Sequence, residues 1–372
     1  MDLELSQEQQ MIKDMTRALL DEHCPIEVVR EMEDDPKGYP TGLWKQMAEA
    51  GLVGLLIPES HGGGGLGLLE AALVYEELGR AMAPTPHFVS AVLSAGMLLE
   101  AGNQAQQEAW LPKIVAGNAI LTPAWLEPDR GFGPEGVALA AKREGDDYLL
   151  SGVKRHVNYA SAADRLIVLA RSDDGIELFL VDPSSDGVEL KQIRSQSGEA
   201  HYRVDLRDVR VPNSARIGAA GTGWETFAKV HQEGLVLQAA QAIGGADRCL
   251  ESTVEYAKVR KQFDKPLGAF QALAHYMADA STQIEGGRVL VHEAAWNGAK
   301  GRSIARFAPM AKLFACNTYQ DVTRVCAQIW GGVAFTIEYD TQMYFRRAKE
   351  MQLSWWDKPY LEELVAADVL DR

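Results

Sequence analysis

The sequence predicts an α+β protein in which a helical N-terminal domain, a middle antiparallel β domain and a C-terminal helical bundle follow one another. Two observations lead to this prediction. The spacing of apolar residues changes twice along the chain, from three or four residues to two and back again. The chain also has 372 residues with 47% hydrophobic content, enough to bury a large core divided between two or three domains. We place the domain boundaries at residues 1–117, 118–217 and 218–372.

The first 117 residues have the apolar spacing of amphipathic helices, as in Leu69, Ala72 and Leu73. Ser6 is followed three residues later by Gln9. This pair predicts a capping box at the start of the first helix, because the two side chains can each accept a hydrogen bond from the other residue's backbone.

Three glycines in the same segment, Gly62, Gly64 and Gly67, satisfy the spacing of a dinucleotide-binding fingerprint. That motif requires a strand leading directly into the glycines and an acidic residue at the end of a second strand. Here Pro58 interrupts the preceding segment, and the acidic residue Glu76 falls inside a predicted helix. We interpret the glycines as an interhelical loop that uses their freedom to adopt positive φ.

Between residues 119 and 217 the apolar residues form short runs, at 148–150, 165–170 and 176–181, separated by Asp, Gly, Pro and Ser. Runs of this length between such breakers predict β-strands. After residue 223 the helical spacing returns in three long segments, 238–257, 271–299 and 305–330. The three predicted domains follow from this order.

Charge and cysteine content exclude several classes of function. A net charge of −15 disfavours nucleic-acid binding, because a protein that binds the phosphate backbone needs a basic surface. The 4 cysteines form no CxxC pair and the 8 histidines are dispersed, so we predict neither a disulfide framework nor a metal site. The acidic N-terminus does not have the pattern of a targeting peptide, and no apolar run has the roughly 18 residues that a membrane span requires. We expect a cytoplasmic protein.

Several separated segments form a recognisable series. In chain order they are Leu43-Trp44, Gly51-Leu52, Ile57-Pro58 and Glu76-Glu77-Leu78-Gly79; Glu127-Pro128, Ser151-Gly152 and Lys154; Arg260 to Phe263 with Pro266 and Gln271; and Gln328 to Phe335 followed by Tyr344 to Lys349. This series resembles the acyl-CoA dehydrogenase family of flavoproteins over essentially the whole chain. One departure is Asp264, which stands where the family usually has glycine.

The resemblance implies an FAD-dependent enzyme that introduces an α,β double bond into an acyl-CoA thioester, in lipid or steroid catabolism, with an electron-transfer flavoprotein as electron acceptor. In that reaction a glutamate removes the α proton while the β hydrogen leaves as hydride to the flavin. The position of the family's glutamate is occupied here by Trp355. An indole cannot take up a proton, so we predict no catalytic base at the usual position.

Two residues could supply a displaced base. Some members of the family carry the glutamate on a helix of the C-terminal domain, and counting back from Arg260 places that position at Gly234. Glu233 is next to it, but on an α-helix its side chain points about 100 degrees away. Asp357 lies two positions after Trp355. Glu233 and Asp357 are therefore the candidate bases of a chain that works alone.

The expected FAD contacts are unevenly preserved. The resemblance implies that each FAD lies at a subunit interface, where one chain holds the flavin ring and its neighbour contacts the pyrophosphate and adenosine. Around the ring, Leu126 replaces a threonine, and His156, Val157 and Asn158 fall in the segment that replaces the family's Trp-Ile-Thr. The residues that would be lent to the neighbour's FAD are present, and they are Arg260, Phe263, Gln271, Gln328, Gly331 and Gly332.

This asymmetry indicates a non-catalytic subunit that completes the FAD site of a second acyl-CoA dehydrogenase-like chain, as in the heteromeric enzymes of bacterial steroid side-chain breakdown. Two alternatives stay open. One is a self-sufficient homomeric dimer or tetramer that uses Glu233 or Asp357. The other is a flavin-dependent oxygenase on the same fold, which needs no α-carbon base. The sequence does not identify the acyl group.

Overall fold

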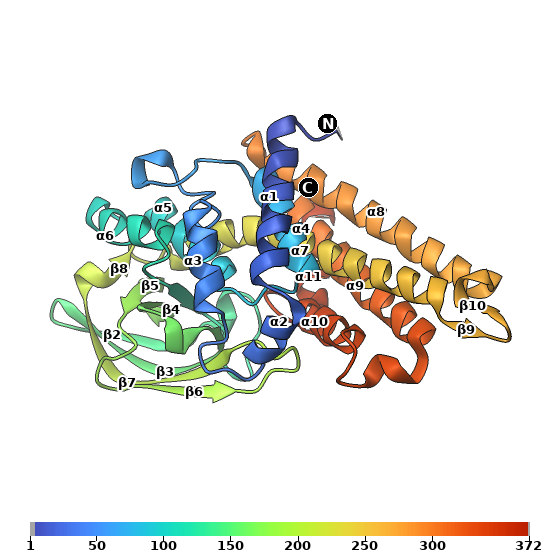
Figure 1. The fold of residues 1–372 in the computed structure, drawn as a ribbon. Coiled ribbons are helices and arrows are strands. Elements are labelled where there is room, and N and C mark those ends of the chain that lie inside the picture. The colour runs from blue at the N-terminus through green and yellow to red at the C-terminus, as the bar shows by residue number, and fades with distance from the viewer. Residues whose placement is uncertain (1–3, 371–372) are drawn as a thin grey trace. The chain divides into compact units, whose positions relative to one another are not determined.

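The computed structural model describes residues 4–370 of the chain (Figure 1). Within this range the chain divides into two compact units. The helical unit contains the chain up to Val29, Gly67–Ala83 and the chain from Leu235 onward. The β unit contains Arg30–Leu66 and Pro84–Gly234. Both units therefore draw on the N-terminal part of the chain as well as on later segments.

A mixed β-sheet forms the centre of the β unit. In the described residues its strands are ordered β6-β7-β3-β2-β4-β5-β8, and β1 pairs with β4. The strands are β1 (Leu121–Ala124), β2 (Ala140–Glu144), β3 (Asp147–Asn158), β4 (Arg165–Ser172), β5 (Gly175–Val181), β6 (Val188–Ile193), β7 (His201–Pro212) and β8 (Arg216–Ile217). Most neighbours are antiparallel, as predicted, but β4 pairs in parallel with β1 and, at one position, with β2.

The two apolar runs at 165–170 and 176–181 form the adjacent strands β4 and β5. They pair antiparallel, with Leu166 opposite Val181. The residues from Leu166 to Ala170 are all buried, which explains why this run is continuously apolar instead of alternating. Together with β1, which is buried at every position, these strands form the buried centre of the sheet.

Short helices complete the β unit. They are α3 (Thr41–Glu49), α5 (Ala95–Ala101), α6 (Gln104–Val115), the 3₁₀ turns η1 (Glu59–His61), η3 (Pro134–Gly136), η4 (Ala160–Ala162) and η5 (Asn213–Ala215), and the π-helix η2 (Phe88–Ser94). Helix η2 is tied to β1 by the backbone N–H of Leu121, which donates to Ser90 Oγ at 3.1 Å. A π-helix of this length is rare and is often found near functional sites.

Long helices make up the helical unit. They are α1 (Gln7–His23), α2 (Ile26–Met32), α4 (Leu68–Arg80), α7 (Gly223–Val259), α8 (Gln271–Ala299), α9 (Phe307–Trp330), α10 (Thr341–Leu353) and α11 (Lys358–Leu370), with the turns η6 (Leu267–Ala269) and η7 (Gly331–Phe335) and a hairpin of β9 (Lys261–Gln262) and β10 (Lys265–Pro266). Helix α7 starts in the β unit and α2 ends there. Helices α8 and α9 lie side by side (Figure 1).

Helices α4 and α7 touch backbone to backbone within the helical unit. A Cβ added to Gly244 of α7 would lie 1.8 Å from the carbonyl oxygen of Glu76, and one added to Gly79 of α4 would lie 2.0 Å from the carbonyl oxygen of Gln241. Glycine is therefore required on both sides of this contact, because any side chain would force the two helices apart.

The predicted capping box is confirmed. Ser6 Oγ accepts from the backbone N–H of Gln9 at 3.2 Å, and Gln9 Oε1 accepts from the N–H of Ser6 at 3.0 Å. The glycine-rich segment forms a loop between η1 and α4, as predicted, but of the three glycines singled out only Gly62 has positive φ, 85°. Gly67, with φ of −91°, is the N-cap of α4. Among residues 4–370, no helix combines the length and apolar character that crossing a membrane would demand.

Candidate functional site

The turn that carries position 355 follows the end of α10. Trp355 and Trp356 both have positive φ, 54° and 72°, and are only 8% and 3% exposed. A bulky residue in the left-handed region costs about 1–3 kcal/mol, and here two occur in succession. Such a turn persists only where other interactions hold it in place.

Those interactions come from Lys312 on α9, which is 1% exposed. Its ammonium group donates to the carbonyl oxygens of Ser354, Trp355 and Trp356, the last two at 2.7 and 2.8 Å. Burial lowers the pKa of Lys312 to about 8, although the charges of Cys316 and Asp357 act in the opposite direction. No local pattern around Lys312 indicates this role, because a lysine in an amphipathic helix is expected on the solvent side.

Asp357, one of the two predicted fallback bases, is half-buried and is engaged in helix formation. Its Oδ1 accepts from the backbone N–H of Tyr360 at 3.2 Å, and its carbonyl oxygen accepts from Leu361 N–H at 3.0 Å. Asp357 therefore acts as the N-cap of α11, a role in which the ionised carboxylate is stabilised by the helix N-terminus.

Glu233, the other fallback base, lies on the part of α7 that belongs to the β unit. Its side chain is exposed to solvent. Desolvation by the protein around it raises its pKa, Glu100 adds to this effect, and Lys229 opposes it. Lys229 is itself paired with Glu100 at 2.6 Å. Glu233 therefore takes up a proton more readily than an ordinary glutamate does.

Gly234 is buried, and an added side chain would meet close neighbours. An added Cβ would lie 3.1 Å from Leu93 and 3.2 Å from the ring of Phe88, both in the π-helix η2. These contacts are tighter than side chains usually make, so Leu93 and Phe88 would have to shift to admit a larger residue. The sequence did not reveal this contact, because 146 positions separate Phe88 from Gly234.

The predicted flavin-ring neighbours come together in the β unit. The carbonyl oxygen of Leu126 accepts from Arg155 N–H at 2.9 Å. The pairing of β3 with β7 shifts between Lys154 and Val157, which marks a bulge at Arg155 and His156. His156 is exposed with φ of 51°, while Val157 and Asn158 are buried. The structure thus places this segment beside residue 126.

A buried ion pair supports the same segment. Lys154 is fully buried and donates to Glu127 Oε1 at 2.7 Å and to the carbonyl oxygen of Trp125 at 3.1 Å. The same carboxylate oxygen accepts from the N–H groups of Ala138 and Leu139, both at 2.9 Å. Burial lowers the pKa of Lys154 to about 8, against the opposing charge of Glu127. These bonds fix the backbone around position 126 whatever side chain it carries.

The residues predicted to be lent to a neighbour's FAD are all exposed. They are Arg260, Phe263, Gln271, Gln328, Gly331 and Gly332, and the exposed fraction of Phe263 is 87%. A Cβ added to either glycine would meet no atom within 4 Å. An exposed guanidinium and open glycine backbone are each suited to a pyrophosphate, which needs charge and close main-chain approach.

Aromatic packing links the segments that carry these residues. Trp330, at the end of α9, stacks on Tyr256 near the end of α7 with ring centroids 3.9 Å apart, and its Nε1 donates to Thr253 Oγ1 at 3.0 Å. Helix α9 continues into the turn that contains Gly331 and Gly332, and α7 continues into the hairpin that contains Arg260 and Phe263. The hairpin lies beyond the ends of α7 and α8 (Figure 1).

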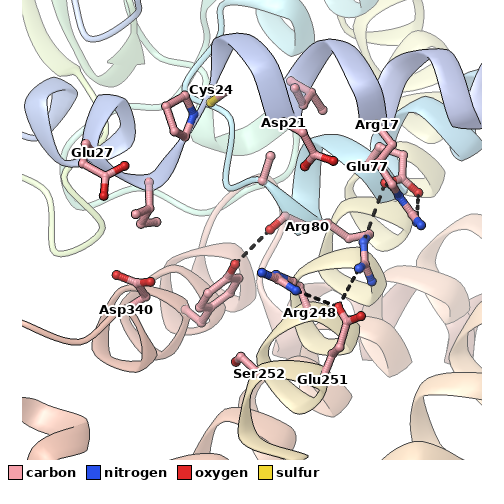
Figure 2. Close-up of a pocket in the computed structure, with 15 residues that line it drawn as sticks. Arg17, Asp21, Cys24, Glu27, Glu77, Arg80, Arg248, Glu251, Ser252 and Asp340 are labelled. Carbon is pink, nitrogen blue, oxygen red and sulfur yellow. Dashed lines mark hydrogen bonds and ion pairs between the residues drawn. The ribbon is translucent and has the colours of Figure 1, made fainter. Parts of the chain in front are cut away.

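A separate cavity of about 550 Å³ lies within the helical unit (Figure 2). None of the predicted site residues lines it. Its arginines are bound to carboxylates, Arg17 to Glu77 at 2.7 Å, and both Arg80 and Arg248 to Glu251 at 2.7 and 2.9 Å. This ion-pair network stabilises the packing of α1, α4 and α7 around the cavity.

The three family models for acyl-CoA dehydrogenases match the chain, the N-terminal domain over residues 6–118, the middle domain over 123–209 and the C-terminal domain over 221–354. The chain belongs to the acyl-CoA dehydrogenase family. Its N-terminal helices, middle sheet and C-terminal helices are the fold of that family, as predicted. Members of the family are FAD-dependent oxidoreductases that act on acyl-CoA thioesters.

The similarity to named relatives covers nearly the whole chain. It is 30% identical to the caffeyl-CoA reductase-Etf complex subunit CarC of Acetobacterium woodii over 92% of each sequence. Among solved structures it is similar to the ChsE4-ChsE5 complex from Mycobacterium tuberculosis, with a TM-score of 0.91, 28% identity and 100% of both chains covered. It is also similar to butyryl-CoA dehydrogenase from Megasphaera elsdenii, with a TM-score of 0.90, 28% identity and 100% of both chains covered.

Proposed function

We propose that this acyl-CoA dehydrogenase chain is the non-catalytic subunit of a heteromeric enzyme and completes the FAD site of an unlike partner. The observation that carries the proposal is the residue at position 355. The turn that presents this position is formed and buried, yet its side chain is the indole of Trp355, which has no basic atom to remove an α proton.

The two displaced-base positions support the same conclusion. Asp357 is used as the N-cap of α11. Position 234 has no carboxylate, and a Cβ added to Gly234 would already lie 3.1 Å from Leu93 and 3.2 Å from Phe88. A chain that had moved its base to either position would need that position to face a substrate carbon, because general-base catalysis requires hydrogen-bond reach of the proton.

The exposed residues Arg260, Gly331 and Gly332 are what this chain would contribute to its partner's FAD site. When FAD is bound at such an interface, it supplies the electron sink for hydride removal. Arg260 would pair with the pyrophosphate through two parallel N–H bonds, and Gly331 and Gly332 would let the backbone approach it. The partner would then carry both the flavin-ring contacts and the catalytic glutamate.

The named relatives support a multi-chain assembly. CarC is named as a subunit of a complex with Etf, and ChsE4-ChsE5 is named as a complex of two chains. By this similarity we infer that the proposed heteromer oxidises an acyl-CoA, of lipid or steroid origin, and passes its electrons to an electron-transfer flavoprotein.

A second candidate function is a homomeric dehydrogenase that uses Glu233. The raised pKa of its carboxyl favours this function, since a base works best when its pKa is near the working pH. The discriminating variant is Glu233→Gln, assayed by desaturation of an acyl-CoA with an artificial electron acceptor. The heteromer proposal expects unchanged activity of the complex, whereas a Glu233 base predicts a loss of at least about a hundredfold.

The FAD content of the purified protein tests the heteromer proposal. We would measure the ratio of flavin absorbance to protein for the chain alone and after co-production with the acyl-CoA dehydrogenase-like chain encoded beside it. We expect little flavin in the lone chain and about one FAD per pair of chains in the complex. One FAD per chain in the lone protein would contradict the proposal.

A matched pair of arginine variants makes the test specific. Arg260→Ala should lower the FAD content of the complex, because it removes the predicted pyrophosphate contact. Arg324→Ala is the control, since Arg324 is also exposed in the helical unit but pairs with Asp321 at 3.1 Å. Equal flavin loss in both variants would mean that Arg260 has no special role.

A further inference from the structure

Three carbonyl groups of one turn converge on a single buried atom. Lys312 Nζ donates to the carbonyl oxygens of Ser354, Trp355 and Trp356, and an ammonium group has three N–H donors. Donors and acceptors therefore match one to one. A buried carbonyl group is destabilising when it loses a hydrogen bond, so these three bonds stabilise the turn.

The same contact compensates for an unusual backbone. The last turn of α10 ends in carbonyls that carry a partial negative charge, and a cation beside them is favourable. Trp355 and Trp356 then continue with φ of 54° and 72°. The three hydrogen bonds from the ammonium group therefore favour this left-handed continuation over an ordinary extended one.

Few other charges act on this group. Cys316, one turn further along α9, and Asp357, directly after the turn, are the groups whose charges influence Lys312. Cys316 is buried and its Sγ lies 3.6 Å from the carbonyl oxygen of Met351 on α10, so it faces the same turn. Burial raises the pKa of this thiol, which keeps it neutral near pH 7.

We propose that Lys312 is the positioning residue of the 354–356 turn, and that its ammonium group holds position 355 in the conformation from which this family presents its base. The backbone of the base position therefore persists in this chain after the base itself has been replaced by Trp355. This inference rests on the proposed function only in treating position 355 as the base position.

Fluorine NMR of the lone chain labelled with 5-fluorotryptophan tests the inference. Trp355→Phe and Trp356→Phe assign the two resonances. Lys312→Met, which keeps the length but removes the donors, should shift both resonances and leave that of Trp125 in place. Lys154→Met is the matched control, because Lys154 is the other buried lysine that binds a tryptophan carbonyl, that of Trp125. It should shift only the Trp125 resonance.

The pH response separates positioning by the ammonium group from simple packing. Loss of one proton leaves two N–H donors for three carbonyls, so the Trp355 and Trp356 resonances of the wild type should move between about pH 6.5 and about pH 9.5. In Lys312→Arg the guanidinium stays charged, and the response should vanish.

Two results would overturn the inference. One is a folded Lys312→Met protein whose Trp355 and Trp356 resonances match the wild type. The other is a Lys312→Arg protein with the wild-type spectrum and the wild-type pH response. This second result tests the role of the ammonium group even if Lys312→Met does not fold. Because no flavin or partner is present in the sample, neither result bears on whether the chain completes a partner's FAD site.

Discussion

Glu76 lies at the centre of a buried ion network in the helical unit, and its removal gives the most quantitative prediction. The side chain is 2% exposed and accepts from Lys13 Nζ at 2.9 Å and from His292 Nε2 at 3.0 Å, while Arg288 Nε lies 3.6 Å away. Burial alone would raise its pKa, but the hydrogen bond from His292 and the charges of Lys13 and Arg288 outweigh this effect and lower the pKa to about 2.

The size of the effect follows from this pKa. An ordinary glutamate has a pKa of 4.5 and Glu76 one of about 2, so at about 1.4 kcal/mol per pKa unit the folded state favours the ionised form by about 3 kcal/mol. We therefore expect Glu76→Gln to lower the free energy of unfolding by about 3 kcal/mol at pH 7. Because the folded pKa is depressed, this contribution is complete above the unfolded pKa and is lost as the pH falls from 4.5 toward 2.

Urea unfolding followed by far-ultraviolet circular dichroism measures the difference. At about pH 3 the gap between wild type and Glu76→Gln should be about half its value at pH 7. Glu285→Gln is the control, because Glu285 also pairs with Arg288 but is 64% exposed, and it should change stability by less than about 1 kcal/mol. A loss below about 1 kcal/mol for Glu76→Gln at pH 7, or a gap that does not change with pH, would refute the reasoning.

Two glycine substitutions test close backbone approach. Gly332→Ala should leave the thermal stability of the lone chain unchanged, because the added Cβ has no neighbour within 4 Å. The same variant should weaken FAD binding by the complex about tenfold in a flavin titration. Gly42→Ala is the control, because Gly42 is equally open, and it should change neither the thermal stability nor FAD binding. Gly244→Ala should lower the urea midpoint by an amount equivalent to about 3 kcal/mol, since its Cβ would lie 1.8 Å from the carbonyl oxygen of Glu76. Gly286→Ala, with its nearest neighbour at 3.8 Å, should be neutral or slightly stabilising.

The helix, sheet, helix order could be predicted from the sequence because each part has a strong local period. The apolar run at 165–170 lies inside β4, and the capping pair Ser6 and Gln9 forms as predicted, since both depend on residues a few positions apart. The parallel pairing of β1 with β4 was not predicted. It joins segments more than forty positions apart, and no local pattern specifies such a partner.

The candidate site was also only partly predictable. The positions of its residues could be assigned by resemblance, but the distant residues that pack against them could not. Lys312 has the spacing of an ordinary helical lysine, and its burial depends on a turn that begins 42 positions later. Phe88 packs against position 234 from a π-helix, whose backbone has no simple periodic signal. Domain boundaries and the roles of the individual site residues stay predictions.

The exposed hairpin and the turn after α9 have a consequence for how the protein can be produced. Val259, Phe263, Phe335 and Ile337 show 74%, 87%, 67% and 77% of their surfaces to water. Apolar side chains displayed in this way favour self-association when no matching surface is present. Synthesis without the proposed partner should therefore lower the yield of soluble chain, so the ratio in which the two chains are made would set how much of this one accumulates.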